Sequence, residues 1–77
     1  MIANSTEVFI ANVRARMQQI GINQKILAER LGVTDSAVSQ VLKGLNKPGL
    51  DMIDRYADAL NIEPYELLRR KKMSKAS

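Results

Sequence analysis

The fold is decided by residues 23–44, which read NQKILAERLGVTDSAVSQVLKG. This stretch predicts two short helices joined by a three-residue turn. Asn23 and Thr34 are expected to cap the N-terminal ends of the two helices, because their side-chain oxygens can accept a backbone N–H bond. Gly32 is expected to end the first of these helices in a left-handed conformation, and Gly44 is expected to end the second.

The second of these helices, expected over residues 35–43, has two chemically different faces. At about 100° per residue, one arc of the helix is apolar and the other carries mostly hydroxyl and amide groups. The apolar arc comprises Ala37, Val38, Val41 and Leu42, and the polar arc comprises Asp35, Ser36, Ser39, Gln40 and Lys43. Hydroxyl and amide groups both donate and accept hydrogen bonds, and so match the base edges of the major groove of DNA. An ordinary solvated face is richer in Lys and Glu, so this face favours a nucleic-acid contact.

The stretch resembles the helix-turn-helix of the Cro/phage-repressor (XRE-like) family, with Gln24 opening the first helix and residues 32–34 as the turn. The resemblance covers roughly residues 9–68 and implies a lambda-repressor-like fold that binds double-stranded DNA as a homodimer. Many members pair an arginine late in their first helix with a glutamate near the end of the third. Met17 and Leu42 occupy those positions here, so we expect an intact fold without that ion pair or its charge near the phosphates.

Apolar residues spaced three and four apart predict three further helices, giving a compact all-α domain of five helices without strands. The first helix is expected from a cap at Asn4 to about Ile20, the fourth over about residues 50–60, and the fifth from Pro64 after a cap at Glu63. The side chains expected to point inward from the first, second and fourth helices are Ile10, Val13, Met17, Ile20, Ile26, Leu27, Leu31, Leu50, Ile53, Tyr56, Ala57 and Leu60.

The composition excludes several classes of function. Among 77 residues there is neither cysteine nor histidine, which excludes disulfides, thiol nucleophiles and the usual zinc sites. The acids are scattered, so we expect no enzyme activity, no metal site and no cofactor. No apolar run is long enough to span a bilayer, and the N-terminus lacks a signal-peptide pattern. We therefore expect a cytoplasmic protein with no membrane partner, and the resemblance implies a nucleoid-associated protein of prokaryotic or phage origin.

Charge divides the chain into a nearly neutral domain and a basic tail. Residues 1–68 carry seven of the 12 Lys and Arg residues against all eight Asp and Glu, and residues 69–75 carry the other five cations. We expect residues 4–70 to form the DNA-binding domain, with the helix-turn-helix at residues 24–43, and residues 71–77 to be a disordered basic tail. So short a chain predicts no sensor domain and no small-molecule ligand.

Base contacts are predicted for the polar arc of the third helix. Ser36 and Gln40 are the leading candidates, because they lie four residues apart and Gln can bond N6 and N7 of adenine together. Ser39 lies between them on the same arc. Asp35 could accept a bond from cytosine N4, although a first-turn acid that complements the helix dipole is the favoured alternative. Thr34 is first a cap that could also meet DNA, and each of these side chains could instead be solvated surface.

Phosphate contacts are predicted on either side of this arc. The resemblance implies that Gln24 and the N-terminus of its helix meet a phosphate, because free N–H groups and the helix dipole favour anions. Further phosphate contacts, with solvated charge as the alternative, are predicted for Lys43, Asn46 and Lys47. Arg14 and Arg16 project from the first helix, where a surface role is favoured over a phosphate contact.

The resemblance implies dimerisation through the region of the fifth helix, where three side chains could pack against a second copy: Tyr65, Leu68 and Met73. The predicted function is a transcriptional regulator that occupies a near-palindromic operator, with half-sites about 34–36 Å apart. A phage Cro-type or immunity repressor and a restriction-modification controller are the favoured classes. An antitoxin, or a protein-interaction module that uses the surface of the third helix, remains open.

Overall fold

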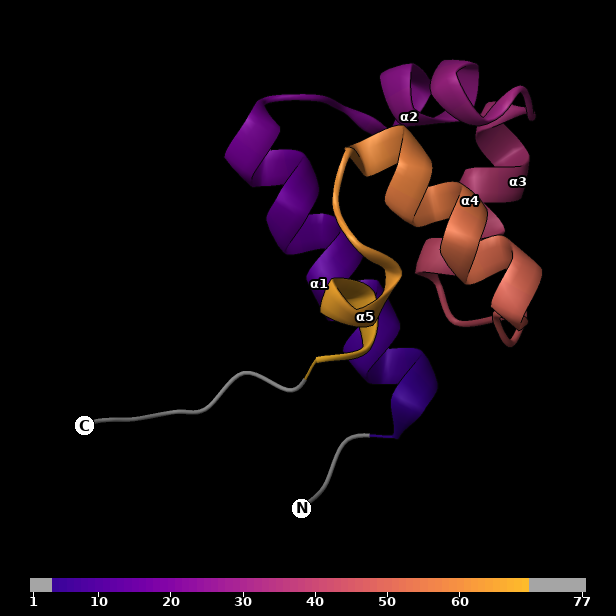
Figure 1. The fold of residues 1–77 in the computed structure, drawn as a ribbon. Coiled ribbons are helices and arrows are strands. Elements are labelled where there is room, and N and C mark those ends of the chain that lie inside the picture. The colour runs from indigo at the N-terminus through magenta and orange to yellow at the C-terminus, as the bar shows by residue number, and fades with distance from the viewer. Residues whose placement is uncertain (1–3, 70–77) are drawn as a thin grey trace.

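The structure, a computed structural model, describes residues 4–69, and every regular element in this part of the chain is a helix (Figure 1). The five helices are α1 Ser5–Ile20, α2 Gln24–Leu31, α3 Asp35–Leu42, α4 Leu50–Leu60 and α5 Pro64–Leu68. The all-α architecture of five helices predicted from the sequence is therefore confirmed.

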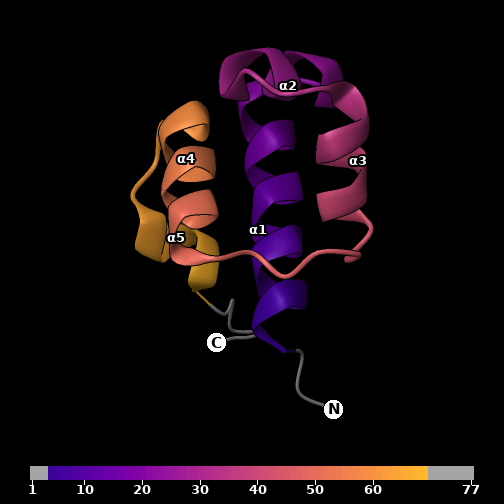
Figure 2. The ribbon, with the colours of Figure 1, turned by 90° about the vertical axis from the view of Figure 1, so that its right-hand side faces the viewer.

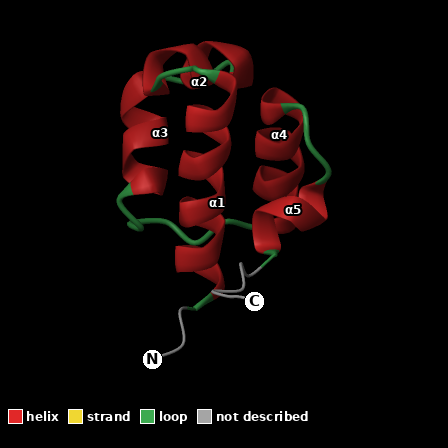
Figure 3. Ribbon diagram, turned by 90° about the vertical axis from the view of Figure 1, so that its left-hand side faces the viewer, coloured by secondary structure: helices red, strands yellow, loops and turns green. Residues whose placement is uncertain are grey.

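The longest helix, α1, forms one side of the fold in Figure 1, and its face with Ala11, Arg14 and Gln18 is exposed. Figure 2 and Figure 3, which view the molecule from opposite sides, show α1 between α3 on one side and α4 with α5 on the other. Helix α2 lies across one end of this arrangement and packs against both α3 and α4, while α1 packs against α4 and α5. As a result, α3 lies at an edge of the molecule with one face free.

Apolar side chains at helical spacing meet between the helices and form one core. Two aromatic rings lie at its centre, where Phe9 of α1 meets Tyr56 of α4 edge to face with a centroid distance of 5.4 Å. Met17 and Leu42, the apolar pair for which the sequence predicted an intact fold without an ion pair, are both part of this core. The buried core residues are Phe9, Val13, Met17, Leu27, Ala28, Leu31, Val38, Val41, Leu42, Ile53, Tyr56, Ala57, Leu60 and Leu67.

The helix ends are defined by local chemistry. Asn4, Asn23 and Thr34 each cap a helix as predicted, accepting the backbone N–H three residues further on at 2.9–3.0 Å. Gly21 and Asn61 end α1 and α4 in the left-handed conformation, with φ of 72° and 60°. These caps satisfy backbone groups that the helices themselves leave unpaired, and so fix where each helix begins and ends.

Three predictions about these helices are wrong. Leu50, expected to point inward, is 80% exposed, because it is the first residue of α4 and precedes the part of the helix that meets the core. Ile26 is 37% exposed, because α2 buries only a narrow stripe and Ile26 lies about 100° from Leu27 at its edge. Glu63 occupies the N-cap position of α5 but makes no side-chain cap bond, consistent with the preference of that position for shorter polar side chains.

A buried polar residue that the sequence analysis missed joins the two ends of the described chain. Asn12 of α1 is only 9% exposed, and its Nδ2 donates to the backbone carbonyls of Leu67 and Arg69, both at 2.9 Å. Both bonds reach across more than 50 residues of sequence. They pair carbonyl groups at the end of the five-residue helix α5, which is too short to satisfy its own ends, and hold it on α1.

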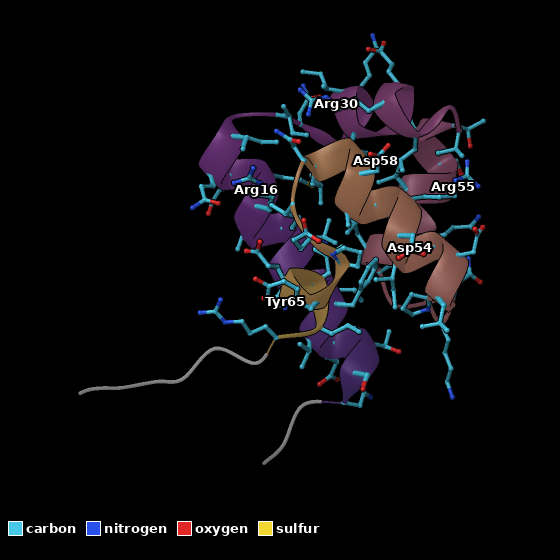
Figure 4. All side chains as sticks on the ribbon, viewed as in Figure 1. Arg16, Arg30, Asp54, Arg55, Asp58 and Tyr65 are labelled. Carbon is cyan, nitrogen blue, oxygen red and sulfur yellow. The ribbon has the colours of Figure 1, made fainter. Side chains whose placement is uncertain are left out.

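Two arginines from different helices bind the C-terminal end of α4 (Figure 4). Arg16 of α1 donates to the carbonyls of Leu60 and Asn61 at 2.9 and 3.3 Å. Arg30 of α2 donates to the carbonyl of Ala59 at 3.0 Å. Because the C-terminal end of a helix carries partial negative charge, these contacts favour the docking of α1 and α2 on α4. Arg16 therefore has a structural role at the end of α4.

Candidate nucleic-acid interface

The two arcs of α3 are separated as the sequence predicted. The buried side of the helix consists of Val38, Val41 and Leu42, and the exposed side carries Asp35, Ser36 and Gln40, with Ser39 half-buried at the boundary. The buried side is packed against the rest of the core. The helix is thus held by its apolar side while hydroxyl, amide and carboxylate groups stand in solvent at fixed spacing.

The turn before α3 depends on a glycine. Gly32 has a φ of 72°, and the following Val33 donates its backbone N–H to the carbonyl of Ala28 at 3.1 Å. No atom would block a Cβ at residue 32, so the requirement for glycine comes from the backbone conformation, which costs other residues about 1–2 kcal/mol. The turn ends α2 abruptly and sets the direction in which α3 leaves it.

A side-chain bond joins the beginnings of the two helices of the motif. The amide Nε2 of Gln24 donates to the carboxylate Oδ1 of Asp35 at 3.0 Å and also lies 3.3 Å from the Asp35 carbonyl oxygen. Asp35 is in the first turn of α3, where a carboxylate is favoured by the helix dipole. Its structural role is therefore evident, and the amide predicted to contact a phosphate is bonded within the protein.

The other end of α3 gathers cationic and amide side chains. Lys43 follows the last helical residue, and Gly44 turns the chain with a φ of 78°, so that α3 ends one residue earlier than predicted. The loop that follows brings further polar groups to this end, where the exposed polar side chains are Lys43, Asn46 and Lys47 and the apolar Leu45 is exposed between them. On the facing helix α1, Arg14 places a guanidinium nitrogen 3.3 Å from the carbonyl oxygen of Leu42.

Acidic residues lie mainly on a different part of the molecule. Residues 51–66, which include most of α4 and α5, contain five of the eight acidic residues of the chain. Asp54 and Asp58 project from the side of α4 that faces the viewer in Figure 4, whereas α3 is on the far side of that view. The acidic surface of α4 and α5 would repel phosphates, whereas the α3 side carries fewer acids, namely Asp35 and, where α4 begins beside α3, Asp51.

The side chains predicted to form a dimer contact lie apart from α3. Tyr65 and Leu68 of α5 are 64% and 41% exposed, and both are large and at least partly apolar. Met73, the third residue predicted there, lies outside the described residues, as does the tail of residues 71–77. Within residues 4–69, no cluster of acidic side chains is placed to hold a metal ion, and no helix is long and apolar enough to cross a membrane.

A helix-turn-helix family model matches residues 13–67 of the chain. Among proteins known from sequence, an uncharacterised HTH-type transcriptional regulator of Methanothermobacter thermautotrophicus is 37% identical over 54 residues, which are 70% of this chain and 78% of that protein. One of Mycobacterium tuberculosis is 36% identical over 50 residues, which are 65% of this chain. The match spans only 36% of the Mycobacterium protein.

Two solved structures resemble the fold. A hypothetical transcription factor from Neisseria superposes with a TM-score of 0.81 and 29% sequence identity, over 86% of this chain and 76% of that chain. The restriction-modification controller protein C.AhdI from Aeromonas hydrophila gives a TM-score of 0.73 and 34% identity, over 80% of this chain and 94% of that chain. Sequence and structure comparisons thus agree on the same class of protein.

Proposed function

Because this chain belongs to the Cro/C1-type (XRE) helix-turn-helix family of DNA-binding transcription regulators, we propose that it inserts α3 into the major groove of an operator and recognises its sequence. The observation that carries this proposal is the exposed hydrogen-bonding face of α3, whose opposite face is locked into the core. A rigid helix that presents side chains of both donor and acceptor character is suited to base edges. The two sequence relatives named above are uncharacterised HTH-type transcriptional regulators.

In this proposal Ser36 and Gln40 contact bases. Both are exposed and in adjacent turns of α3, and the Gln40 amide can bond adenine N6 and N7 together. Because Ser39 is half-buried, its hydroxyl is less accessible to a base than the side chains of Ser36 and Gln40. The oxygen of Thr34 accepts the N–H of Ala37, which leaves its O–H free to donate to a base or a phosphate.

The ends of α2 and α3 would contact the phosphates. Lys43, Asn46 and Lys47 can supply donors that are not specific to sequence and hold the helix in register. At the other end, Gln24 would exchange its bond to Asp35 for a bond to phosphate, since an amide N–H₂ has only two protons to donate. That exchange would release the Asp35 carboxylate to accept a bond from cytosine N4.

We further propose that the protein acts as a homodimer. An exposed tyrosine and leucine on α5, Tyr65 and Leu68, are suited to pack against a second copy, and Met73 would extend that contact. A two-fold dimer would bind a near-palindromic operator with half-sites about 34–36 Å apart. Such a chain, acting in the cytoplasm of a prokaryote or on phage DNA, would regulate by occupying its operator.

The proposed regulator is either a controller of restriction-modification genes or a repressor of phage type. Similarity to C.AhdI, which extends over 94% of that controller, supports the first of these. An antitoxin would use the same DNA-binding face. A protein-interaction module using α3 is the alternative from another class, and it predicts no preferred DNA sequence.

The test is a selection of bound duplexes from a random-sequence pool. The proposal predicts an inverted repeat, and it predicts that Gln40→Ala will bind with an affinity reduced by about 1–3 kcal/mol and lose its preference at one position of each half-site. A matched control is Gln19→Ala, which removes an exposed amide of the same kind from α1, beside a hollow lined by Glu66 and Arg69 rather than by α3. Recovery of no enriched sequence, or the same selected site for Gln40→Ala and wild type, would contradict the assignment.

A further inference from the structure

The end of α3 is completed by a side chain from another helix. The backbone N–H groups of residues 43–45 pair with the carbonyls of Ser39, Val41 and Gln40. The carbonyl of Leu42, the last helical residue, receives its bond from Nη2 of Arg14, which lies 28 residues earlier in the chain. The arginine therefore places a full positive charge where the helix dipole is negative.

This guanidinium remains accessible. Arg14 is exposed, and its bond to Leu42 engages only one of the five N–H groups of an arginine. Beside it is an open hollow of about 570 Å³, lined by Ala11, Ala15, Met17 and Gln18 of α1 and by Ile22. Arg14 is the charged member of that lining, and no acidic side chain belongs to it. An anion can approach without displacing a carboxylate.

Arg14 lies at the same end of α3 as the cationic side chains described above. Lys43 is the first residue after α3, Lys47 is in the loop that follows, and the Arg14 guanidinium touches the last carbonyl of the same helix. Positive charges from two separate segments, Arg14 and Lys43, thus lie at one end of the proposed recognition helix. The planar fork of an arginine can hold a phosphate with two bonds at once, which a lysine cannot do.

We propose that Arg14 is a DNA-phosphate contact that also positions α3. The proposal rests on the function proposed above. One nitrogen of the guanidinium stays on the Leu42 carbonyl while the other N–H groups bind a backbone phosphate beside the major groove. The same side chain then joins the DNA backbone to the end of α3 and fixes how that helix lies in the groove.

The competing explanation is that Arg14 is only a cap on a helix end. Arg30 provides the comparison, because it is also exposed and also donates to a helix C-terminal carbonyl, that of Ala59 at 3.0 Å. Arg30 lies at the end of α4, next to the acidic surface rather than beside α3 (Figure 4). Arg14→Gln and Arg30→Gln therefore remove the same charge and the same kind of bond in two places.

The experiment measures binding of both variants to a generic mixed-sequence duplex between about 50 and 200 mM salt. Arg14→Gln should bind roughly tenfold more weakly at low salt and should reduce the slope of log K against log salt by about 0.9 per monomer. Arg30→Gln should leave affinity and slope unchanged. Thermal unfolding of each variant without DNA verifies that the assay compares folded proteins.

A second measurement needs no substitution. In wild-type protein the Nε–H resonance of Arg14 should move when duplex is added, and that of Arg30 should not. An unchanged slope for Arg14→Gln, or an Arg14 resonance that stays in place while α3 resonances move, would overturn the proposal and leave the proposed function standing. Failure of the wild type to bind any duplex would overturn both.

Discussion

Asn12→Ala tests how firmly α5 is held on the rest of the fold. The change removes the donor that serves the carbonyls of Leu67 and Arg69, each at 2.9 Å. Leu67 is fully buried, so its carbonyl would be left without a partner, which costs about 1–3 kcal/mol. The Arg69 carbonyl lies near the surface, where water can replace the lost bond at little cost.

We therefore expect Asn12→Ala to lower the free energy of unfolding by about 2–3 kcal/mol, including the small space left by the side chain. For a domain of this size, that loss corresponds to a decrease in melting temperature of roughly 8–24 °C. Circular dichroism during heating and during urea titration measures both quantities. Because α5 carries the proposed dimer contact, the dimer measured by sedimentation should also weaken at temperatures where the variant is folded.

The matched control is Asn46→Ala, which removes the same side chain from an exposed loop and should change stability by less than about 0.5 kcal/mol. If Asn12→Ala were as stable as this control, the two bonds to the end of the chain would not hold α5. If stability fell while dimerisation was unaffected, α5 would be important for folding but would not form the contact between copies.

Three further predictions concern DNA affinity, alkaline stability and assembly. Lys43→Ala should weaken binding to all duplexes alike and flatten the salt slope by about one unit per monomer, whereas a loss confined to one sequence would contradict a phosphate role. Burial raises the pKa of Tyr56, against a smaller lowering by the Arg55 charge. The tyrosine therefore ionises first in the unfolded chain, above a pH of about 10, and the free energy of unfolding falls as pH rises from there toward the folded pKa. Tyr56→Phe should abolish this loss of stability in urea titrations, whereas Tyr65→Phe, at an exposed tyrosine, should not. Leu68→Glu should shift sedimentation from dimer to monomer, and an unchanged dimer would place the contact elsewhere.

The helices could be predicted from the sequence because their determinants are local. A cap residue such as Thr34 and a left-handed stop such as Gly32 act within a few residues of chain, and both are found where the sequence placed them. The division of α3 into two faces follows from the period of the helix alone. The exposure of side chains at the ends of helices was less predictable, because whether Leu50 is covered depends on how far neighbouring helices extend.

Contacts between distant segments could not be predicted in the same way. Asn12 lies near Phe9 and Val13 on the core side of α1, which was a signal that its amide would need a buried partner. The identity of that partner depends on how α5 packs, more than 50 residues later. The bond from Arg14 to the end of α3 likewise depends on how two helices pack, and no motif in the sequence predicts it.

Whether α3 enters the major groove is tested most directly by mapping where DNA touches the protein. Nuclear magnetic resonance spectra of the labelled protein, recorded as the selected duplex is added, report each backbone amide and the side-chain amide of Gln40. If α3 enters the groove, the largest changes will fall on Gln40 and residues 34–40, with the outward side of α4 around Asp54 unaffected. Largest changes on α4 and α5, with the Gln40 amide unmoved, would show that α3 does not enter the groove.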